Sequence, residues 1–387
     1  MENYERICLC ALNRIFGYNP IVGLRLLERF GSAERIFRAG RTELAAVMGF
    51  NSKYLDDITP AAVDQAGMEL EKLARDGCVF ISERDEGYPV PLKECEDHPI
   101  GLYCKSTSPQ QSLFNGRTFI SIVGTRDISP YGREWCGKIV ESLAGSTVKP
   151  VIVSGLAMGT DICAHMAALE CGLSTIAVMA TGIDDVYPYR HRAHAKRICG
   201  HEGSSLVSDY PPRTAPIAIN FLRRNRIIAG LSSATILVES RNRGGGMLTA
   251  RLAFSYNRDV FALPGRIDDS RSEGCNSLID NNVAKPICRL DSLVRHLGLG
   301  ECRPAGKIDL KTFMLDRYSA SLGEEDSLLA VAIAEKVGER RGISFDELCE
   351  ELSKPYSSIC RLANMMENDG IISTDLLQRC CLKVKNV

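Results

Sequence analysis

The sequence has no apolar run near the 18 residues that a membrane span needs, and residues 1–6 lack the basic start and long apolar stretch of a signal peptide. Its 16 cysteines include no CxxC pair, so the cysteines indicate scattered thiols rather than a clustered metal site. It also has no charge excess, because 47 Lys and Arg oppose 48 Asp and Glu. We therefore expect a cytoplasmic protein with reduced thiols, no membrane segment and no general attraction to polyanions.

The usual motifs of nucleotide enzymes and hydrolases are missing as well. The loop Gly244–Gly246 has neither the G-K-[ST] ending of a P-loop nor the G-x-G-x-x-G spacing of a dinucleotide-binding turn. Ser154, Asp161 and His165 supply the residue types of a catalytic triad, but Ser154 does not stand in a G-x-S-x-G elbow. We therefore predict no catalytic residue, no metal site and no cofactor.

What the sequence does contain is the pattern of an α/β protein. At 387 residues the chain is long enough for two to three domains. Between 119 and 290, short β-branched runs alternate with helical segments of about 15 to 25 residues, which is typical of a Rossmann-like parallel sheet covered by helices on both faces. The predicted strands are Phe119–Val123, Val151–Val153, Thr175–Met179, Ser205–Val207, Thr235–Val238 and Val260–Leu263.

Helical patterns flank this core on both sides. We predict a helical domain over residues 1–75, a Rossmann-like domain over 76–298 with its core at 119–290, a linker over 299–326 and a winged-helix domain over 327–387. Gly31 and Gly49 are expected to close short helices in a left-handed conformation. Such a helical module either binds the DNA backbone or is purely structural, and the sequence leaves both open. Ser344 and Glu347 have the spacing of a capping box.

Several predicted strands run into glycine turns at what would be one edge of the sheet. In a parallel sheet, ligands bind outside the carboxyl ends of the strands, where free backbone N–H groups at helix N-termini attract anions. Arg126 would add a bidentate guanidinium to the first turn. We predict a phosphate pocket that consists of Gly124, Thr125, Arg126, Ser154, Gly155, Gly159, Gly244, Gly245, Gly246 and Thr249.

A strongly basic block lies within the neutral chain. From residue 187 to 226, eight Lys and Arg oppose two acids, which gives a net charge of +6. A single-stranded nucleic acid needs charge for its backbone and a flat face for its bases. The residues predicted to supply these are Phe221, Arg223, Arg224, Asn225 and Arg226; the alternative is a solvated basic helix start. The three histidines of the block are interpreted as surface residues; they are His191, His194 and His201.

Together these motifs make the chain from about Phe119 to Asn282 similar to the DNA-processing protein A family, also called DprA or Smf. The likeness is carried by Ile122–Arg126, Ser154–Ala157 with Asp161 and His165, Gly182–Asp184 with Tyr187-Pro188, Phe221 with Arg224–Leu231, Leu248–Ala250, Pro264-Gly265 and Gly274–Ile279. The chain departs from the family's usual pattern at Ala218, where many members have lysine, and at Gly244–Gly246, where the loop usually begins Ser-Gly-Ser.

The resemblance implies a non-catalytic protein that binds single-stranded DNA through a Rossmann-like domain, forms a homodimer and loads the RecA recombinase during natural transformation. In the family the Gly-x-Arg turn contacts a backbone phosphate, which would be Arg126 here, and the aromatic residue packs against a base, which would be Phe221. The competing hypothesis is a nucleotide-processing enzyme, such as a lysine-decarboxylase-like phosphoribohydrolase, with the same phosphate cradle. The sequence places no paired acids beside the Gly244 loop to support it.

The C-terminal segment has no charge that favours DNA. Residues 327–387 contain eight Lys and Arg against nine Asp and Glu, whereas a helix that binds a DNA groove normally presents a basic face. For the predicted winged helix we therefore expect a role in protein contact or regulation.

Overall fold

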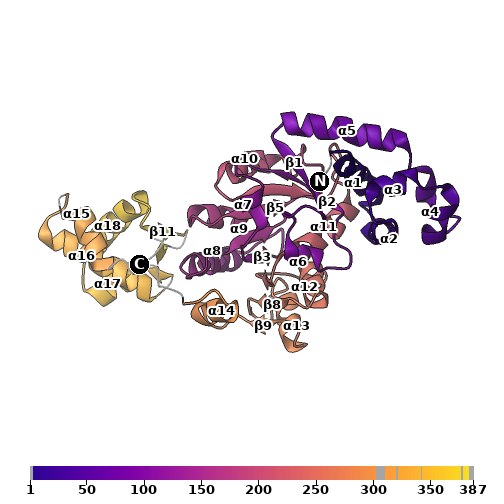
Figure 1. The fold of residues 1–387 in the computed structure, drawn as a ribbon. Coiled ribbons are helices and arrows are strands. Elements are labelled where there is room, and N and C mark those ends of the chain that lie inside the picture. The colour runs from indigo at the N-terminus through magenta and orange to yellow at the C-terminus, as the bar shows by residue number, and fades with distance from the viewer. Residues whose placement is uncertain (1–2, 302–309, 320, 341, 376–377, 383–387) are drawn as a thin grey trace. The chain divides into compact units, whose positions relative to one another are not determined.

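The structure is a computed structural model that describes residues 3–301, 310–319, 321–340, 342–375 and 378–382. The chain divides into two compact units, Met1–Cys302 and Arg303–Val387. The first unit contains a large sheet between layers of helices together with a group of N-terminal helices, and the second consists of helices and a short sheet (Figure 1). The mixed α/β class predicted from the sequence is confirmed for the first unit.

The sheet of the first unit has the strand order β1-β2-β6-β5-β4-β3-β7-β8-β9. Neighbouring strands from β6 to β9 are parallel, whereas β1 and β2 extend the β6 side as an antiparallel pair. The order reverses at β3, which pairs with β4 on one side and with β7 on the other. The strands are β1 Cys78–Ser82, β2 Gly101–Lys105, β3 Phe119–Val123, β4 Val151–Ser154, β5 Thr175–Val178, β6 Ser205–Ser208, β7 Ala234–Leu237, β8 Asp259–Ala262 and β9 Lys285–Pro286.

Each strand predicted from the sequence is present within one residue of its expected bounds. The central strand β3 is buried throughout, and its alternate side chains enter two different cores. Ile120 and Ile122 face one helical layer, while Phe119 and Val123 face the other, as the two-residue period of a strand requires. The outer strands β1, β2 and β9, of which β1 and β9 form the sheet edges, were not among the predicted strands, because they lie outside the alternation of strands and helices that marks the core.

Helices cover both faces of this sheet (Figure 1). One layer contains α8 Pro130–Ala144, α9 Thr160–Glu170 and α14 Leu290–His296, with α10 Arg192–Gly200 beside α9. The opposite layer contains α11 Ala218–Leu231, α12 Gly245–Ser255 and α13 Glu273–Asp280. The short helices α6 Val90–Lys93 and α7 Gln111–Phe114 pack on this second layer's core.

The N-terminal helices share a core with the sheet. They are α1 Asn3–Phe16, α2 Pro20–Phe30, α3 Ala33–Arg38, α4 Arg41–Met48 and α5 Pro60–Arg75. Gly31 ends α2 in the predicted left-handed conformation, with a φ of +79° and a ψ of −22°. Gly49 ends α4 with a φ of +89° and a ψ of 144°, so its predicted left-handed conformation is wrong. Phe16 of α1 belongs to the same buried cluster as Tyr103 of β2 and Leu206 of β6. The helical segment is therefore a part of the first unit and not a separately packed body.

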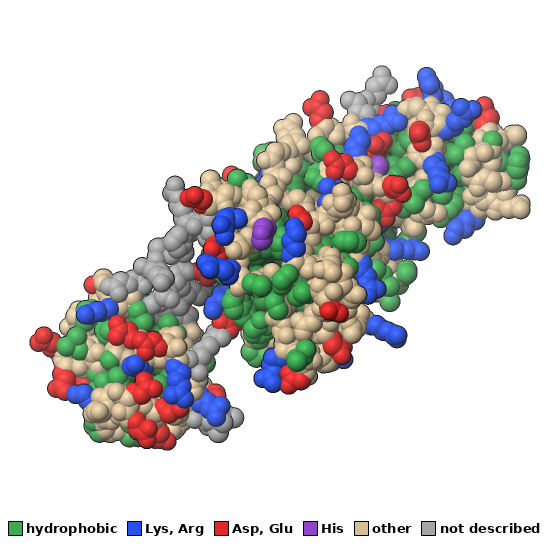
Figure 2. All heavy atoms as spheres, turned by 90° about the horizontal axis from the view of Figure 1, so that it is seen from below, with side chains coloured by type: hydrophobic (Ala, Val, Ile, Leu, Met, Phe, Trp, Pro, Cys, Tyr) green, Lys and Arg blue, Asp and Glu red, His purple; other side chains and the backbone are tan. Residues whose placement is uncertain are grey.

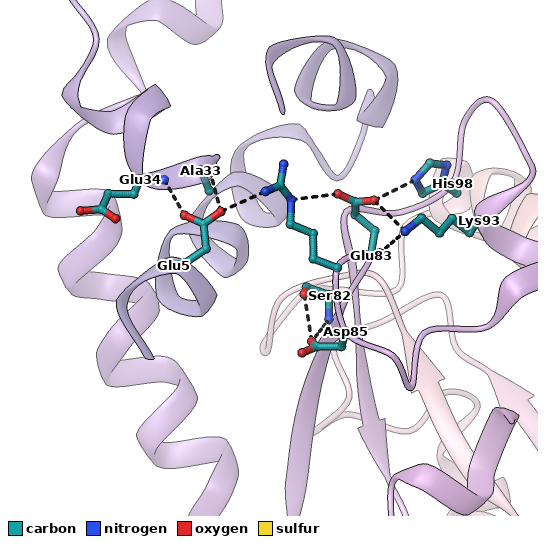
Figure 3. Close-up of polar contacts among 9 residues, drawn as sticks. Glu5, Ala33, Glu34, Ser82, Glu83, Asp85, Lys93 and His98 are labelled. Atoms are coloured by element: carbon teal, nitrogen blue, oxygen red, sulfur yellow. Dashed lines mark hydrogen bonds and ion pairs between the residues drawn. The ribbon is translucent and has the colours of Figure 1, made fainter. Parts of the chain in front are cut away.

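A chain of charged groups also joins the N-terminal helices to the sheet (Figure 3). The carboxylate of Glu5 accepts hydrogen bonds from the backbone N–H groups of Ala33 and Glu34, both at 2.8 Å, and so caps the start of α3. Arg84, which follows β1, lies between Glu5 at 3.8 Å and Glu83 at 3.4 Å. This network spans the boundary between the helical segment and the edge strand.

The second unit contains α15 Leu310–Tyr318, α16 Glu324–Glu339, α17 Phe345–Leu352 and α18 Tyr356–Asn368, with β10 Ile343–Ser344, β11 Ile372–Thr374 and β12 Arg379–Leu382 in the order β10-β12-β11. The predicted capping box of Ser344 and Glu347 is present at the start of α17. The predicted linker 299–326 differs from the structure, because Met314 and Tyr318 of α15 are buried in this unit's core. Residues 302–309 of that linker lie outside the described residues. The winged-helix assignment stays a prediction.

Candidate nucleic-acid interface

The turns after β3, β4 and β7 meet at the carboxyl edge of the sheet, where the strand order reverses. A Cβ at Gly124 would lie 2.5 Å from the Thr160 hydroxyl, and one at Gly246 would lie 3.0 Å from the Cα of Gly124. Gly159 has a φ of +77°, and a Cβ there would lie 2.3 Å from the carbonyl oxygen of Thr125. The glycines expected at one edge of the sheet do converge there, and their missing side chains allow the backbones to touch.

The turn after β4 is closed by a carboxylate of the chain itself. The buried hydroxyl of Ser154 donates to the carbonyl oxygen of Ile122 at 2.6 Å. The backbone N–H groups of Gly155 and Ala157 donate to Asp161 at 3.2 and 3.4 Å. Burial raises the pKa of the Asp161 carboxyl, and the nearby Arg224 opposes that rise. The prediction that Ser154 and the Gly155 amide bind phosphate is therefore wrong for this structure, because Asp161 already occupies the place of the anion.

A second internal carboxylate occupies the start of α8. Ser129 caps this helix by accepting a hydrogen bond from the Gly132 N–H at 3.0 Å. Buried Glu239, which follows β7, accepts from the Ser129 N–H at 2.8 Å and from its hydroxyl. A Cβ at Gly132 would lie 2.5 Å from Glu239, so the carboxylate fits against the helix. The N-terminus of α8, proposed from the sequence as a phosphate site, is thus filled by Glu239.

The glycine loop before α12 keeps a free helix end. Gly244 is the N-cap residue of α12 and provides no side-chain cap. The Asn225 side-chain N–H₂ donates to the Gly245 carbonyl at 3.3 Å and fixes the loop to α11. The hydroxyl of buried Thr249 donates to the same carbonyl at 3.1 Å. Thr249 therefore does not supply the hydroxyl donor predicted for it, while the first amides of α12 retain the geometry of an anion site.

The arginine run is divided between the interior and the surface. Arg224 is buried and donates to the carbonyl oxygens of Gly155, at 2.6 Å, and Val178. Arg226 is buried too, in an ion pair of 2.5 Å with Asp209. Arg223 alone of the three is exposed. The prediction that Arg224 and Arg226 contact the strand is therefore wrong, because the part of α11 that carries them lies against the sheet.

An exposed row of rings and guanidinium groups lies beside these turns. Arg126 places its Cζ atom 5.2 Å from the centre of the Phe221 ring, and Phe221 meets Tyr187 edge-to-face at 5.5 Å. Tyr187 in turn is 6.3 Å from Tyr189, over which Arg192 lies at 4.7 Å. We call these five residues the ring–guanidinium row. Arg126, Arg192 and both tyrosines are exposed, so the row offers charge and flat surfaces to solvent.

A shallow depression of about 340 Å³ adjoins the row at Arg126. Arg133, Arg190, His191 and His194 also line it. Arg126, Arg133 and Arg190 form no ion pair with another residue that the structure describes. Asp127 also lines the depression, but it is paired with Arg271 at 3.1 Å, so the depression is electropositive. The assignment of His191 to the surface is wrong: it is buried, and its Nδ1 lies 2.9 Å from the carbonyl oxygen of Leu156.

The residue types of a triad are present, but His165 pairs with Thr175 instead of completing a triad with Ser154 and Asp161. The Nδ1 atom of His165 pairs with the Thr175 hydroxyl at 2.7 Å, and the Ser154 hydroxyl is bonded to a backbone carbonyl. Burial is the main cause that lowers the pKa of His165, to about 3. His165 is therefore a neutral core residue and not a general base aimed at Ser154.

Comparison with known proteins shows to which family the chain belongs. The sequence model of the family described as DNA recombination-mediator protein A matches residues 79–298, which include the three turns and the ring–guanidinium row. The chain belongs to the DNA recombination-mediator protein A family. A member of this family, protein Smf of Synechocystis sp., is 34% identical over 299 residues, which are 77% of this chain and 74% of that protein.

Solved structures of family members have the same fold. The X-ray structure of DNA processing protein A from Streptococcus pneumoniae has a TM-score of 0.64 at 30% identity and covers 76% of this chain and 98% of its own. The Helicobacter pylori protein, described for its unique single-stranded DNA binding mode, has a TM-score of 0.50 at 29% identity and covers 56% of this chain and 95% of its own. In the present chain, no helix among the residues that the structure describes is long and apolar enough to cross a membrane.

The sequence did not reveal the residues that fill the anion positions. Asp161 and His165 belong to the sequence motif that begins at Ser154, but only the fold shows that the Asp161 carboxylate accepts a hydrogen bond from the Gly155 amide. Glu239 lies 110 positions from the Ser129 that it binds, so no local pattern could have paired them. A carboxylate directly after the buried strand β7 is the one signal that was available.

Proposed function

We propose that this chain is a non-catalytic, cytoplasmic mediator that binds single-stranded DNA and loads the RecA recombinase onto it during natural transformation. The single observation that carries the proposal is Arg126 held over the Phe221 ring at an exposed edge of the sheet. A guanidinium can bind a backbone phosphate, and a ring can stack on a base of any sequence. The description of the Helicobacter pylori relative supports the choice of a single strand.

The distribution of charge favours a local groove over a uniformly basic surface. The ring–guanidinium row and the adjoining depression bring four arginines and several rings to one edge. Elsewhere acidic and basic side chains are interspersed, as one face of the molecule shows (Figure 2). Such an arrangement supports binding through a few phosphates and leaves the rest of the surface for protein partners.

The competing hydrolase hypothesis has less support. The acids at the turns, Asp161 and Glu239, direct their oxygens to backbone N–H groups, and neither is left free to activate water. We further propose that the chain acts as a homodimer, and that its second unit, a winged helix, contacts proteins or regulates the complex.

The test is a binding titration with a labelled oligothymidylate over a range of salt concentrations. We expect the log of the affinity to fall with the log of salt with a slope of about −2 to −4, for three to five phosphate contacts per protomer. A matched duplex should bind more weakly, because its bases are not free to stack. Purified protein that released free base from nucleoside monophosphates, or that bound no single strand, would overturn the proposal.

Loading and assembly need separate measurements. With a single-strand-binding protein already on the DNA, this chain should shorten the lag before RecA filaments form, and an Arg126→Ala variant should shorten it less. Light scattering on the eluted protein should give twice the mass of one chain. An unchanged lag would remove the mediator role, and a monomeric mass would remove the dimer.

A further inference from the structure

Tyr18 lies at the carboxyl edge of the sheet although it belongs to the N-terminal helical segment. It stands between α1 and α2, with 42% of its surface exposed. Its ring centre is 5.7 Å from that of Tyr210, which follows β6. The Cζ atom of Arg223 lies over the Tyr18 ring at 5.1 Å. Arg223 is exposed and forms no ion pair with any residue that the structure describes.

Buried hydrogen bonds hold this corner in place. The Asn13 side-chain N–H₂ donates to the Asp209 carbonyl oxygen at 2.9 Å, and its amide oxygen accepts from the Gly101 N–H at 3.1 Å. A Cβ at Gly17 would lie 2.8 Å from the Asn13 carbonyl, so the chain turns tightly just before Tyr18. The ring is therefore fixed on the sheet before any ligand arrives, which lowers the entropy lost on binding.

A guanidinium group lies over an aromatic ring at two neighbouring positions of α11. Phe221 has Arg126 over its ring, and two residues further Arg223 lies over Tyr18. Between them Leu222 is 47% exposed, an apolar surface of the kind that bases cover. A guanidinium held over a ring gives a base a stacking surface and a phosphate a donor at one point.

We propose that Tyr18 and Arg223 form a second stacking subsite for the same DNA strand, so that the helical segment is a part of the DNA-binding surface. The inference rests on the proposed function and extends it to Tyr18, which lies outside the family's matched region of residues 79–298. It also decides between the two roles that the sequence leaves open for the helical segment. A strand held at Arg126 and Phe221 continues over Arg223 to Tyr18.

The experiment compares full-length variants on oligothymidylates of about 5 and about 15 nucleotides, a range of site sizes known for single-strand-binding domains. Tyr18→Ala should weaken binding of the longer strand about fivefold or more, which is the lower end of one base–aromatic stack, and should leave the shorter strand little changed. Tyr18→Phe should bind as the natural protein does, because it keeps the ring. The matched control is Tyr4→Ala, since Tyr4 is similarly exposed, at 47%, on α1.

The outcomes separate the two proposals. If the natural protein binds neither strand, the proposed function fails. If it binds both and Tyr18→Ala binds the longer strand equally well, the second subsite alone fails. Arg223→Gln is a second variant in case Tyr18→Ala does not fold, and it should show the same dependence on strand length. A photoreactive thymidine should form a crosslink to Tyr18 only within the longer strand; its absence there would also overturn the subsite.

Discussion

Arg126 and Arg224 are both predicted from the sequence to contact the strand, and the structure predicts opposite effects for their loss. Arg126 is exposed, so Arg126→Ala should change the free energy of unfolding by no more than about 0.5 kcal/mol. It removes one phosphate contact, which should make the salt slope less negative by about 0.7. The affinity ratio between natural protein and variant should therefore shrink roughly 2.6-fold between about 50 and 200 mM salt.

Arg224 is buried close to Asp161 at the Gly155 turn, where a Cβ would lie 2.5 Å from the Arg224 Nη2 atom and 2.6 Å from the Asp161 Oδ2 atom. Arg224→Ala leaves the Asp161 carboxylate buried without its cation and two carbonyls without their donor. Each buried carbonyl left without its donor costs about 1 to 3 kcal/mol, and Asp161 also loses a nearby positive charge, against a total stability of about 5 to 15 kcal/mol for a domain. This variant should unfold at a much lower urea concentration.

Urea denaturation and fluorescence anisotropy at two salt concentrations measure both effects. Arg75→Ala is the matched control, because Arg75 is exposed on α5 and takes no part in the interface. An Arg126→Ala protein with normal stability, normal affinity and an unchanged salt slope would refute the interface. An Arg224→Ala protein with normal stability and weak binding would refute the assignment of Arg224 to the interior.

Three further perturbations test the turns and the core. Glu239→Ala removes the carboxylate from the start of α8 and should lower the free energy of unfolding by about 2 kcal/mol. Inorganic phosphate should then raise the Tm of this variant but not that of the natural protein. An equal effect of phosphate on both proteins would show that Glu239 does not occupy an anion site. Gly159→Ala places a methyl group against the Thr125 carbonyl at a residue with a positive φ. It should lower the free energy of unfolding, measured by urea denaturation, by at least about 2 kcal/mol, and it should weaken DNA binding. A normal affinity for DNA would show that the turn does not position Arg126. His165 takes up no proton in the folded state until pH falls to about 3, whereas the unfolded chain takes it up near its ordinary pKa of 6.5. Stability should therefore fall by about 1.4 kcal/mol per pH unit below that value, and His165→Leu should flatten this dependence; an equal slope in both proteins would contradict the burial argument.

The parts of the fold that depend on local periodicity could be predicted from the sequence. The strands of the parallel core and the helix ends at Gly31 and Gly49 follow from residue patterns a few positions long. The glycine turns follow from strand ends in the same way. The antiparallel pair β1 and β2 was missed because pairing with β6 is a property of the assembled sheet.

The site could be predicted only in part, because burial is decided by partners far along the chain. Asp209 at the end of β6 makes a buried Arg226 tolerable, and the Gly155 and Val178 carbonyls do the same for Arg224. When those partners are not known, a run of arginines beside an aromatic residue predicts an exposed surface, because an unpaired charge is rarely buried. Arg126 and Arg223 are exposed and need no buried partner, and their contact with DNA stays a prediction.

On the proposed function, we expect the carboxylates of Asp161 and Glu239 to favour long ligands over small ones. At two positions where a Rossmann sheet would hold the phosphate of a single nucleotide, the structure has the chain's own acids. A mononucleotide is left with one weak surface contact. A strand of DNA gains from several such contacts at once, because each bound nucleotide raises the effective concentration of the next. On the proposed function, free nucleotides would compete poorly with DNA, and this discrimination requires no recognition of sequence.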